Sequence, residues 1–418
     1  MADKIVINRQ AITTAVEAQN ITDAGLGGDT PNAVITILTS ATADGTPADH
    51  AEIAVGFATA VGEQRALCFS SEHGAASTDD TRSARPDQLV EFNHESGGHD
   101  VTGNLTAFIA DGYTIDFTKN DTATAYLLTS IMFSGLTAAK VGTIDPDNTE
   151  DGTVDITDVG FEPDLVLIIG NQTNLSANGG ADSFFTIGYC LNNLDQRCLS
   201  FFENDAEADG LPYQEIFSNR AGEIINAAGV MHGVELSDFD ADGFTVTTRD
   251  GGPGTILYAY IAIKFSSLQA EAFNKATPTS TGNDSITGLG IQPSFIFDIF
   301  SHLGSFDSHT QSALAGAFGF SAMDTNDQIS NSVSVEDQAA TTNTQSVSND
   351  QAIDSPDDDG SAGLAASLSS FNSDGFTLNF SSVLGTAANQ FGFVLGNVAG
   401  GGEVVQDIIG PGIIPFLR

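Results

Sequence analysis

The chain has 418 residues, and its 13 Lys and Arg stand against 55 Asp and Glu, which gives a formal net charge of −42. Phosphate binding requires clustered Lys and Arg, so this balance excludes nucleic acid as a main partner and argues against an anionic membrane surface. Hydrophobic residues make up 41% of the chain, which is enough for packed cores and unlike the composition of a disordered protein.

The acidic surplus suits a concentrated salt solution, where screening removes the repulsion between carboxylates. We therefore expect a protein of a salt-loving host or of its virus, and the alternative is an ordinary acidic extracellular or virion protein. The N-terminus has no apolar run of signal-peptide length, and no stretch reaches the roughly 18 apolar residues that span a bilayer. We expect synthesis in a host cytoplasm and no membrane insertion.

Three segments of the chain share the same landmarks in the same order. Each opens with a proline beside an apolar run and closes with an Asp-Gly pair before an alternating strand. The landmarks are Pro31 with Asp111 and Gly112, Pro163 with Asp242 and Gly243, and Pro293 with Asp374 and Gly375. The pairs Gln64-Arg65 and Gln196-Arg197 also coincide between the first two segments. This spacing predicts a threefold internal repeat.

Taken in chain order, residues 1–28 are expected to form an N-terminal arm, which contains a helical stretch at 12–19. The three repeats are expected at 29–137, 138–267 and 268–399. A turn of helix is the expectation for residues 222–231 in the second repeat. A glycine joint and an apolar tail follow at 400–418.

The repeats are typical of β-structure. Residues 164–170 and 294–300 are short apolar runs bounded by turn residues, which predicts buried strands. In the last strand of the second repeat, we expect Tyr258, Tyr260 and Lys264 on a wetter face and Ile261, Ile263 and Phe265 on the core face. The sequence thus predicts an all-β protein of three tandem antiparallel β-sandwiches, jelly-roll-like and about 130 residues each, arranged as a rod.

The fullest form of the repeated pattern lies in the second repeat, at Phe161, Pro163, Asp164, Val166, Asp242, Gly243, Phe244, Tyr258 and Lys264. It resembles a module of tail-fibre and other virion proteins of tailed phages, whose opening strand reads F-x-P-D-L-V and whose closing hairpin reads D-G-F-T-V before a Y-x-A-W strand. The likeness covers only the ends of each repeat. The usual tryptophans are absent, and Asn32 and Ser294 stand where Asp is expected. The resemblance implies a sandwich fold and a virion context, with no active site.

One acidic stretch, between the first and second repeats, has the spacing of a cation-binding loop. Its candidate ligands are Asp147, Thr149, Asp151, Thr153, Asp155 and Asp158, with Gly152 in the tight turn. Thr stands at the third position and Asp replaces the bidentate Glu of an EF-hand. Two interpretations stay open, a structural Ca²⁺ or Mg²⁺ and a plain acidic loop between domains.

Catalytic motifs are missing from the chain. There is no G-x-S-x-G elbow, no phosphate-binding Gly-Lys-Ser/Thr and no H-E-x-x-H. The three cysteines, Cys68, Cys190 and Cys198, are too few for a disulfide framework. Buried free thiols are the expectation, and a bridge between Cys190 and Cys198 is the alternative. We expect a protein that is not an enzyme.

The C-terminal third of the chain is acidic and lacks Lys and Arg before its final residue. From Ala276 to Leu417 the chain has 15 Asp and Glu and no Lys or Arg. We expect the third repeat to form no Lys or Arg ion pairs of its own and to gain stability steeply with salt or divalent cations. The apolar tail carries Ile408, Ile409, Ile413, Ile414 and Phe416, so it is expected to pack back on the third repeat or to dock into a neighbouring subunit.

These features together indicate a structural or adhesive virion protein of a tailed virus. A tail fibre, a capsid turret and a capsid decoration protein are equally compatible with the sequence. We expect a homo-oligomer, trimer or pentamer, which contacts other virion proteins and presents loops to a host surface glycan or protein. The alternative is a carbohydrate-binding or carbohydrate-active β-sandwich protein, against which the absence of Trp and the count of six Tyr weigh.

Overall fold

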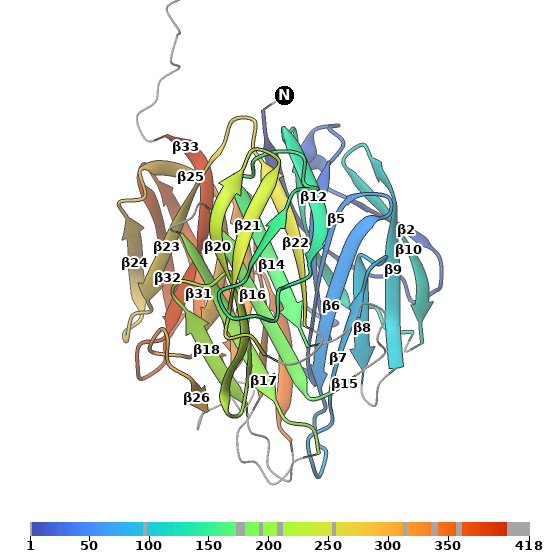
Figure 1. Cartoon of the computed structure of the whole chain (residues 1–418), viewed down its shortest axis with the longest axis vertical. Helices are drawn as coiled ribbons and strands as arrows, with labels where there is room; N and C mark the ends of the chain where they lie inside the picture. Colours follow the sequence, from blue (N-terminus) through green and yellow to red (C-terminus); the bar gives the residue numbers. More distant parts are fainter. Residues whose placement is uncertain are drawn as a thin grey trace, which may run out of the picture.

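The computed structural model describes residues 2–398, apart from 95–97, 122, 173–179, 192–194, 207–211, 253–255, 312–315, 336–341 and 357–361. Within these residues the protein is all-β, as predicted, and its one helical element is the short 3-10 helix Ala24–Leu26 (η1). The described residues contain no helix that is long and apolar enough to cross a membrane. The strands fall into three sets, which we call units 1, 2 and 3 (Figure 1).

Each unit has eleven strands in the same order. Unit 1 comprises Lys4–Ala11 (β1), Ala18–Thr22 (β2), Ala33–Thr39 (β3), Ala48–Asp49 (β4), Ala51–Ala60 (β5), Glu63–Ser71 (β6), Asp80–Arg85 (β7), Val90–His94 (β8), Gly98–Ile109 (β9), Gly112–Asn120 (β10) and Leu127–Ser134 (β11). Unit 2 comprises Ala138–Ile144 (β12), Thr153–Ile156 (β13), Leu165–Asn171 (β14), Gly180–Ala181 (β15), Ser183–Cys190 (β16), Gln196–Glu203 (β17), Tyr213–Phe217 (β18), Gly222–Asn226 (β19), Gly229–Asp240 (β20), Gly243–Arg249 (β21) and Leu257–Lys264 (β22). Unit 3 comprises Gln269–Ala276 (β23), Gly282–Thr287 (β24), Ile291–Ser301 (β25), Thr310–Gln311 (β26), Phe318–Asp324 (β27), Gln328–Val335 (β28), Thr344–Asn349 (β29), Ile353–Pro356 (β30), Ala362–Asn372 (β31), Gly375–Ser382 (β32) and Asn389–Val398 (β33).

Every unit is a sandwich of a larger and a smaller antiparallel sheet. The larger sheet of unit 1 has the order β1-β11-β3-β5-β6-β7-β15, and its smaller sheet has the order β2-β10-β9-β8. Units 2 and 3 repeat these orders strand for strand. The seventh strand of each larger sheet comes from another unit, because β15 pairs with β7, β26 with β18 and β4 with β29.

This exchange closes the three units into a ring. Unit 2 donates a strand to unit 1, unit 3 donates one to unit 2, and unit 1 donates one to unit 3. The three larger sheets face one another and share a single apolar core, to which all three units contribute. Phe69, Phe201 and Phe318, one from each unit, lie with ring centroids 5.1–5.8 Å apart. The expected rod is therefore wrong: the units surround a common axis.

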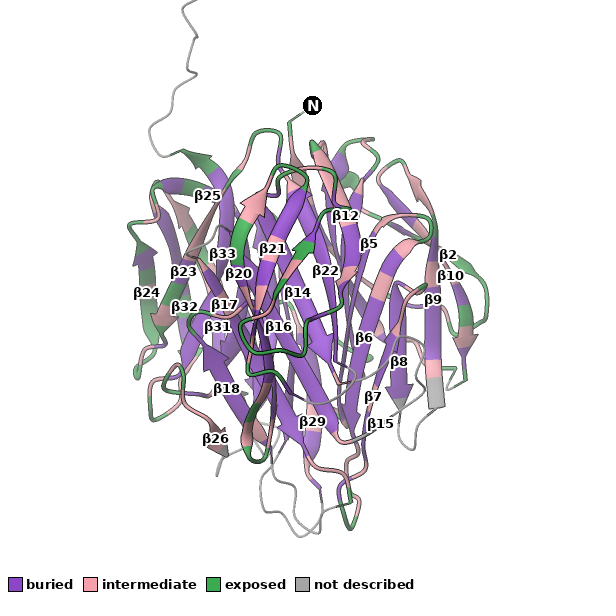
Figure 2. Ribbon diagram, in the orientation of Figure 1, coloured by how far each residue is buried: buried purple, intermediate pink, exposed green. Residues whose placement is uncertain are grey.

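Each unit also has a core of its own between its two sheets. The larger sheets are consequently buried on both faces, as Figure 2 shows for β14 and β16. Tyr258 and Tyr260 lie fully buried inside unit 2, while Ile261 and Ile263 lie in the shared core. The expected wetter face of this strand is wrong for the two tyrosines, because a second apolar layer covers the sheet.

The N-terminal residues do not form a separate arm. β1 pairs along its whole length with β11, and β2 pairs with β10, so both strands belong to the sandwich of unit 1. The stretch expected to be helical, 12–19, contains bends and the start of β2. Residues 222–231 likewise form β19, a turn and the start of β20 instead of a helical turn. The tail residues Ile408, Ile409, Ile413, Ile414 and Phe416 lie outside the described residues.

Candidate functional site

The repeated Asp-Gly pairs sit in the same turn of each unit, before the strands β10, β21 and β32. A side chain on any of the three glycines would collide with a backbone carbonyl of the neighbouring strand; the pairs are Gly112 with Ile21, Gly243 with Ile156, and Gly375 with Ile286. Asp111 accepts a hydrogen bond from the Gly28 N–H, and Asp374 accepts one from the Gly290 N–H. The landmarks are thus structural, and the buried prolines Pro31, Pro163 and Pro293 lie close by at the opening of the core strands.

A glutamine joins the two sheets at the same place in every unit. The side-chain oxygens of Gln64, Gln196 and Gln328 each accept a hydrogen bond of 2.7 Å from the backbone N–H of Leu105, Leu236 and Leu368 respectively. Each leucine lies at or next to a β-bulge, where a backbone donor is left without a ladder partner. The sequence signal was the shared Gln of the first two repeats, and the structure extends it to the third.

The predicted cation loop does not gather its ligands. Asp147 accepts a hydrogen bond from the Thr149 N–H at 2.9 Å, and Asp151 forms an ion pair with Arg249. Thr153 and Asp155 lie on the exposed face of β13, and Asp158 accepts a hydrogen bond from the Tyr260 hydroxyl. Among the described residues, no group of three or more His, Cys, Asp or Glu is placed to hold a metal ion. A Ca²⁺ or Mg²⁺ in this loop stays a prediction.

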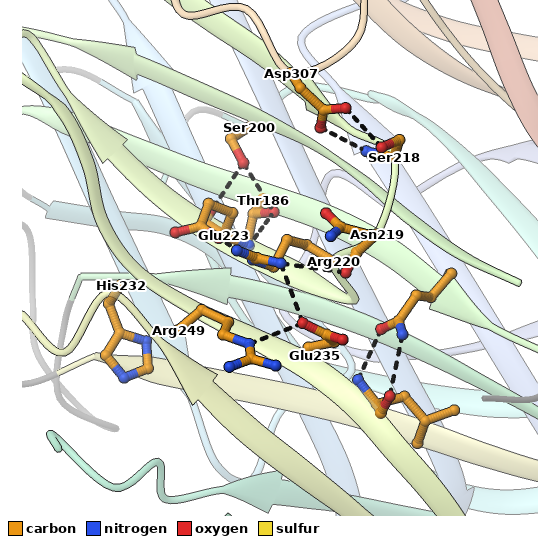
Figure 3. A network of polar contacts seen from close by, with 12 residues as sticks. Thr186, Ser200, Ser218, Asn219, Arg220, Glu223, His232, Glu235, Arg249 and Asp307 are labelled. Atoms are coloured by element: carbon orange, nitrogen blue, oxygen red, sulfur yellow. Dashed lines mark hydrogen bonds and ion pairs between the residues drawn. The ribbon is translucent and has the colours of Figure 1, made fainter. Parts of the chain in front are cut away.

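Asp151 instead ends a ladder of charges at the smaller sheet of unit 2. Figure 3 shows its other members, Arg220, Glu223, Glu235 and Arg249. Arg220 lies between Glu223 and Glu235, at N–O distances of 3.3 and 3.2 Å, and Arg249 contacts Glu235 at 2.8 Å. Glu223, Glu235 and Arg249 lie in β19, β20 and β21, whereas Arg220 lies in the turn before β19 and Asp151 in the turn before β13. Alternating charges therefore connect three neighbouring strands of the sheet with the turn that leads into the fourth. The sequence offered no signal for this ladder, because its members are scattered over about a hundred residues.

Glu223 is the buried end of the ladder, with 0% of its surface exposed. Burial raises its pKa well above the ordinary value, and the Arg220 guanidinium offsets part of this. A side chain on Gly233 would collide with the Glu223 carboxylate, so the glycine makes the room that this carboxylate occupies. The Ser200 hydroxyl donates to the Glu223 backbone carbonyl at 2.6 Å, which ties the larger sheet to the smaller one.

Buried acids also lie at the places where the units exchange strands. Between units 1 and 2, burial and the charge of Glu203 raise the pKa of Asp80 well above its ordinary value. Between units 2 and 3, Glu215 lies 3.4 Å from His309, and burial together with the charge of Asp307 raises the pKa of Glu215 to about 7. Of these two acids, Glu215 therefore changes its protonation near neutral pH.

Two shallow grooves open on the surface between units. The first is lined by Gly45, Pro47, Val347, Asn349, Gln351, Asp354, Pro356, Ala365, Ser381 and Ser382. The second is lined by Glu162, Pro163, Asp164, Leu191, Phe239, Leu268, Gln269, Ala270 and Glu271. Both grooves are largely polar, and the lining of the second includes Phe239 together with the acids Glu162, Asp164 and Glu271.

The three cysteines are buried free thiols, as expected, and burial raises the pKa of Cys68 and Cys198 well above the ordinary value. The alternative bridge between Cys190 and Cys198 is absent. Buried protonated thiols are inert, so these residues pack as small apolar groups.

Comparison with protein-family models, with curated proteins and with solved structures finds no match to this chain. Its fold and side-chain geometry are therefore the basis for assigning it a function.

Proposed function

We propose that the chain is a structural component of a virus particle, a tail fibre, capsid turret or capsid decoration protein, from a salt-rich environment. The observation that carries this proposal is the reciprocal strand exchange between the three units. It ties the three larger sheets into one body that buries a single common core. A closed body of this kind resists mechanical stress and proteolysis, because no unit can open without exposing the core of the other two.

The sequence resemblance and the charge support the same role. The phage-type landmarks, such as Pro163 with Asp242 and Gly243, hold the sandwich together and contribute no reactive group. The surplus of carboxylates keeps such a surface hydrated in concentrated salt. On this proposal the apolar C-terminal tail attaches the body to other virion proteins, and its loops face the host surface.

The direct test uses virus particles purified from the source culture. Mass spectrometry should find the chain as an abundant component, and antibodies raised against the purified chain should label the particle surface. Deleting residues 399–418 should leave the melting temperature unchanged and abolish incorporation into particles. Recovery of the chain only from particle-free fractions would overturn the proposal. Mass measurement of the purified chain tests the expected trimer or pentamer.

Carbohydrate binding is the second candidate, and the groove that contains Phe239 favours it. An aromatic ring beside the carboxylates of Glu162 and Asp164 offers a stacking surface and hydrogen-bond acceptors. A glycan array with the purified chain tests this role. Binding that is lost in Phe239→Ala would support it, and the variant Val230→Ala, at an exposed position elsewhere in unit 2, is the control.

A further inference from the structure

Unit 3 contains a buried polar cluster between its two sheets. Asp298 lies in β25, its direct neighbour in β27 is Ser321, and the direct neighbour of Ser321 in β28 is Ser330. Directly paired residues project their side chains from the same face of a sheet. Gln390 in β33 lies two residues along that strand from the direct partner of Asp298, so its side chain projects from the same face. All four residues are 0% exposed.

The cluster faces the inner core of unit 3. Ile296 and Phe300, which flank Asp298 at alternate positions of β25, both belong to the apolar core between the two sheets of this unit. Side chains at alternate positions of a strand share a face. The carboxylate of Asp298 therefore lies in an apolar layer, far from bulk water.

The polar atoms of the cluster lack partners among the described residues. Neither carboxylate oxygen of Asp298 has a hydrogen bond, and the same holds for the hydroxyls of Ser321 and Ser330 and for both side-chain polar atoms of Gln390. Burial raises the pKa of Asp298 well above its ordinary value, although the nearby Ile299 N–H opposes this. A buried polar group without a partner destabilises the folded state, so this cluster is costly unless a ligand occupies it.

Units 1 and 2 have no such cluster at the equivalent positions. Gly56 and Gly188 occupy the place of Ser321, and a side chain there would collide with the carbonyl oxygens of Leu89 and Ala221 respectively. Because unit 3 accommodates a serine, its smaller sheet must leave more room at this point. The large ring of Tyr260 in unit 2 is also replaced, by Gly392. Unit 3 is therefore both roomier and more polar here.

We propose that unit 3 binds a dehydrated monovalent cation, Na⁺ or K⁺, between Asp298, Ser321, Ser330 and Gln390. Carboxylate, hydroxyl and amide oxygens are hard ligands, which suit hard cations. One carboxylate balances one positive charge, whereas a divalent ion would leave a net charge buried in the core. The ion would supply a positive charge inside unit 3, whose sequence has no Lys or Arg after Lys275. This inference does not depend on the proposed function.

The test compares melting of the full chain in NaCl, KCl and tetramethylammonium chloride at equal ionic strength. General screening is the same in the three salts, but tetramethylammonium is too large to enter the cluster. Above the dissociation constant, each tenfold rise in Na⁺ or K⁺ should raise the folding equilibrium constant about tenfold over the tetramethylammonium reference. The better of the two ions identifies the natural ligand.

The variant Asp298→Asn should lose this cation-specific increment and keep the general salt effect. Asp238→Asn, which removes the same charge from an exposed position of unit 2, should keep both. Equal melting of the parent chain in all three salts would overturn the proposal, as would an Asp298→Asn variant that keeps the increment.

A direct measurement covers the case in which Asp298→Asn does not fold. Equilibrium dialysis of the parent chain against radioactive Na⁺ or Rb⁺ should give one bound ion per chain, and Ser321→Ala should bind at least tenfold more weakly. The absence of a bound ion in the folded parent chain would overturn the proposal.

Discussion

Units 2 and 3 share one strand order, yet their buried carboxylates have different partners. In unit 2 the buried Glu223 faces Arg220, and the ladder continues through Glu235 and Arg249. At the corresponding place in unit 3, Asp354 accepts a hydrogen bond from the neutral side chain of Asn349. A shorter acid and an uncharged donor thus replace a full ion pair. Both units therefore place an acid with a polar partner at this position, and the charge of that partner differs.

The absence of basic residues in unit 3 is less complete than the sequence suggested. Lys275 in β23 forms an ion pair with Asp284 in β24 at 2.5 Å, which corrects the expectation that this unit has no Lys or Arg pairs of its own. Arg9 of unit 1 also contacts Asp350 of unit 3. A neighbouring unit therefore supplies part of the positive charge that unit 3 lacks. The expected steep increase in the stability of unit 3 with salt or divalent cations stays a prediction.

The largest loss of stability is expected from a substitution in the shared core. The same experiment tests whether the three units unfold separately or as one body. Phe318→Ala removes a ring that contacts Phe69 and Phe201, and it should lower the free energy of unfolding by about 3–5 kcal/mol. Because the core is common to the ring, urea denaturation should show one transition for the whole chain. A separate early transition with the amplitude of a single unit would contradict this.

The ladder of unit 2 should be more sensitive than the neutral link of unit 3. Arg220→Ala leaves the Glu223 carboxylate buried without its cation, so the free energy of unfolding should fall by about 2–3 kcal/mol. Asn349→Ala in unit 3 should cost about 1 kcal/mol, because the hydrogen bond lost there has a neutral donor. Chemical denaturation measures both. Adding Glu223→Gln to Arg220→Ala should recover part of the loss; equal costs in the two units would refute the comparison.

Removal of Arg9, the cation of unit 1 that contacts Asp350 of unit 3, should lower the stability by a smaller amount. Arg9→Ala breaks the pairs with Asp44 and Asp350, whose side chains are 50% and 65% exposed, so the expected cost is about 1 kcal/mol at low salt. The cost should shrink in concentrated salt, where screening weakens exposed pairs. Thermal melts at two salt concentrations measure it, with Lys119→Ala, which removes an exposed pair inside unit 1, as the control. A cost that grows with salt would count against this account.

The smallest effect is confined to a pH interval at the junction of units 2 and 3. The pKa of Glu215 is raised from 4.5 to about 7, so between these values the folded chain binds more protons than the unfolded chain. Stability must therefore fall as the pH rises from 4.5 to 7. Glu215→Gln should flatten this slope, which pH-dependent melts measure. Glu235→Gln, at a half-buried position of the ladder, serves for comparison. A slope unchanged in Glu215→Gln would rule out this group as its source.

Some of the candidate sites could be predicted from sequence patterns, and others could not. The Asp-Gly turns and the Gln64 and Gln196 positions were visible because they recur at constant spacing. The ladder from Glu223 to Asp151 and the cluster around Asp298 were not, because each unites residues from separate strands that lie far apart in the chain. The acidic loop at Asp147–Asp158 had the spacing of a cation site, but its groups are engaged by Thr149, Arg249 and Tyr260 instead.

The sequence by itself determined the all-β class, the threefold repeat and the turn positions, since these depend on local residue types and on periodicity along the chain. Only the tertiary structure decided that β1 and β2, within the expected N-terminal arm, belong to a sandwich, that both faces of β22 are buried, and that the units form a ring. Those features depend on pairing between residues that are far apart in the chain. The exchanged strands are two residues long, too short to leave any periodic signal, although they close the molecule.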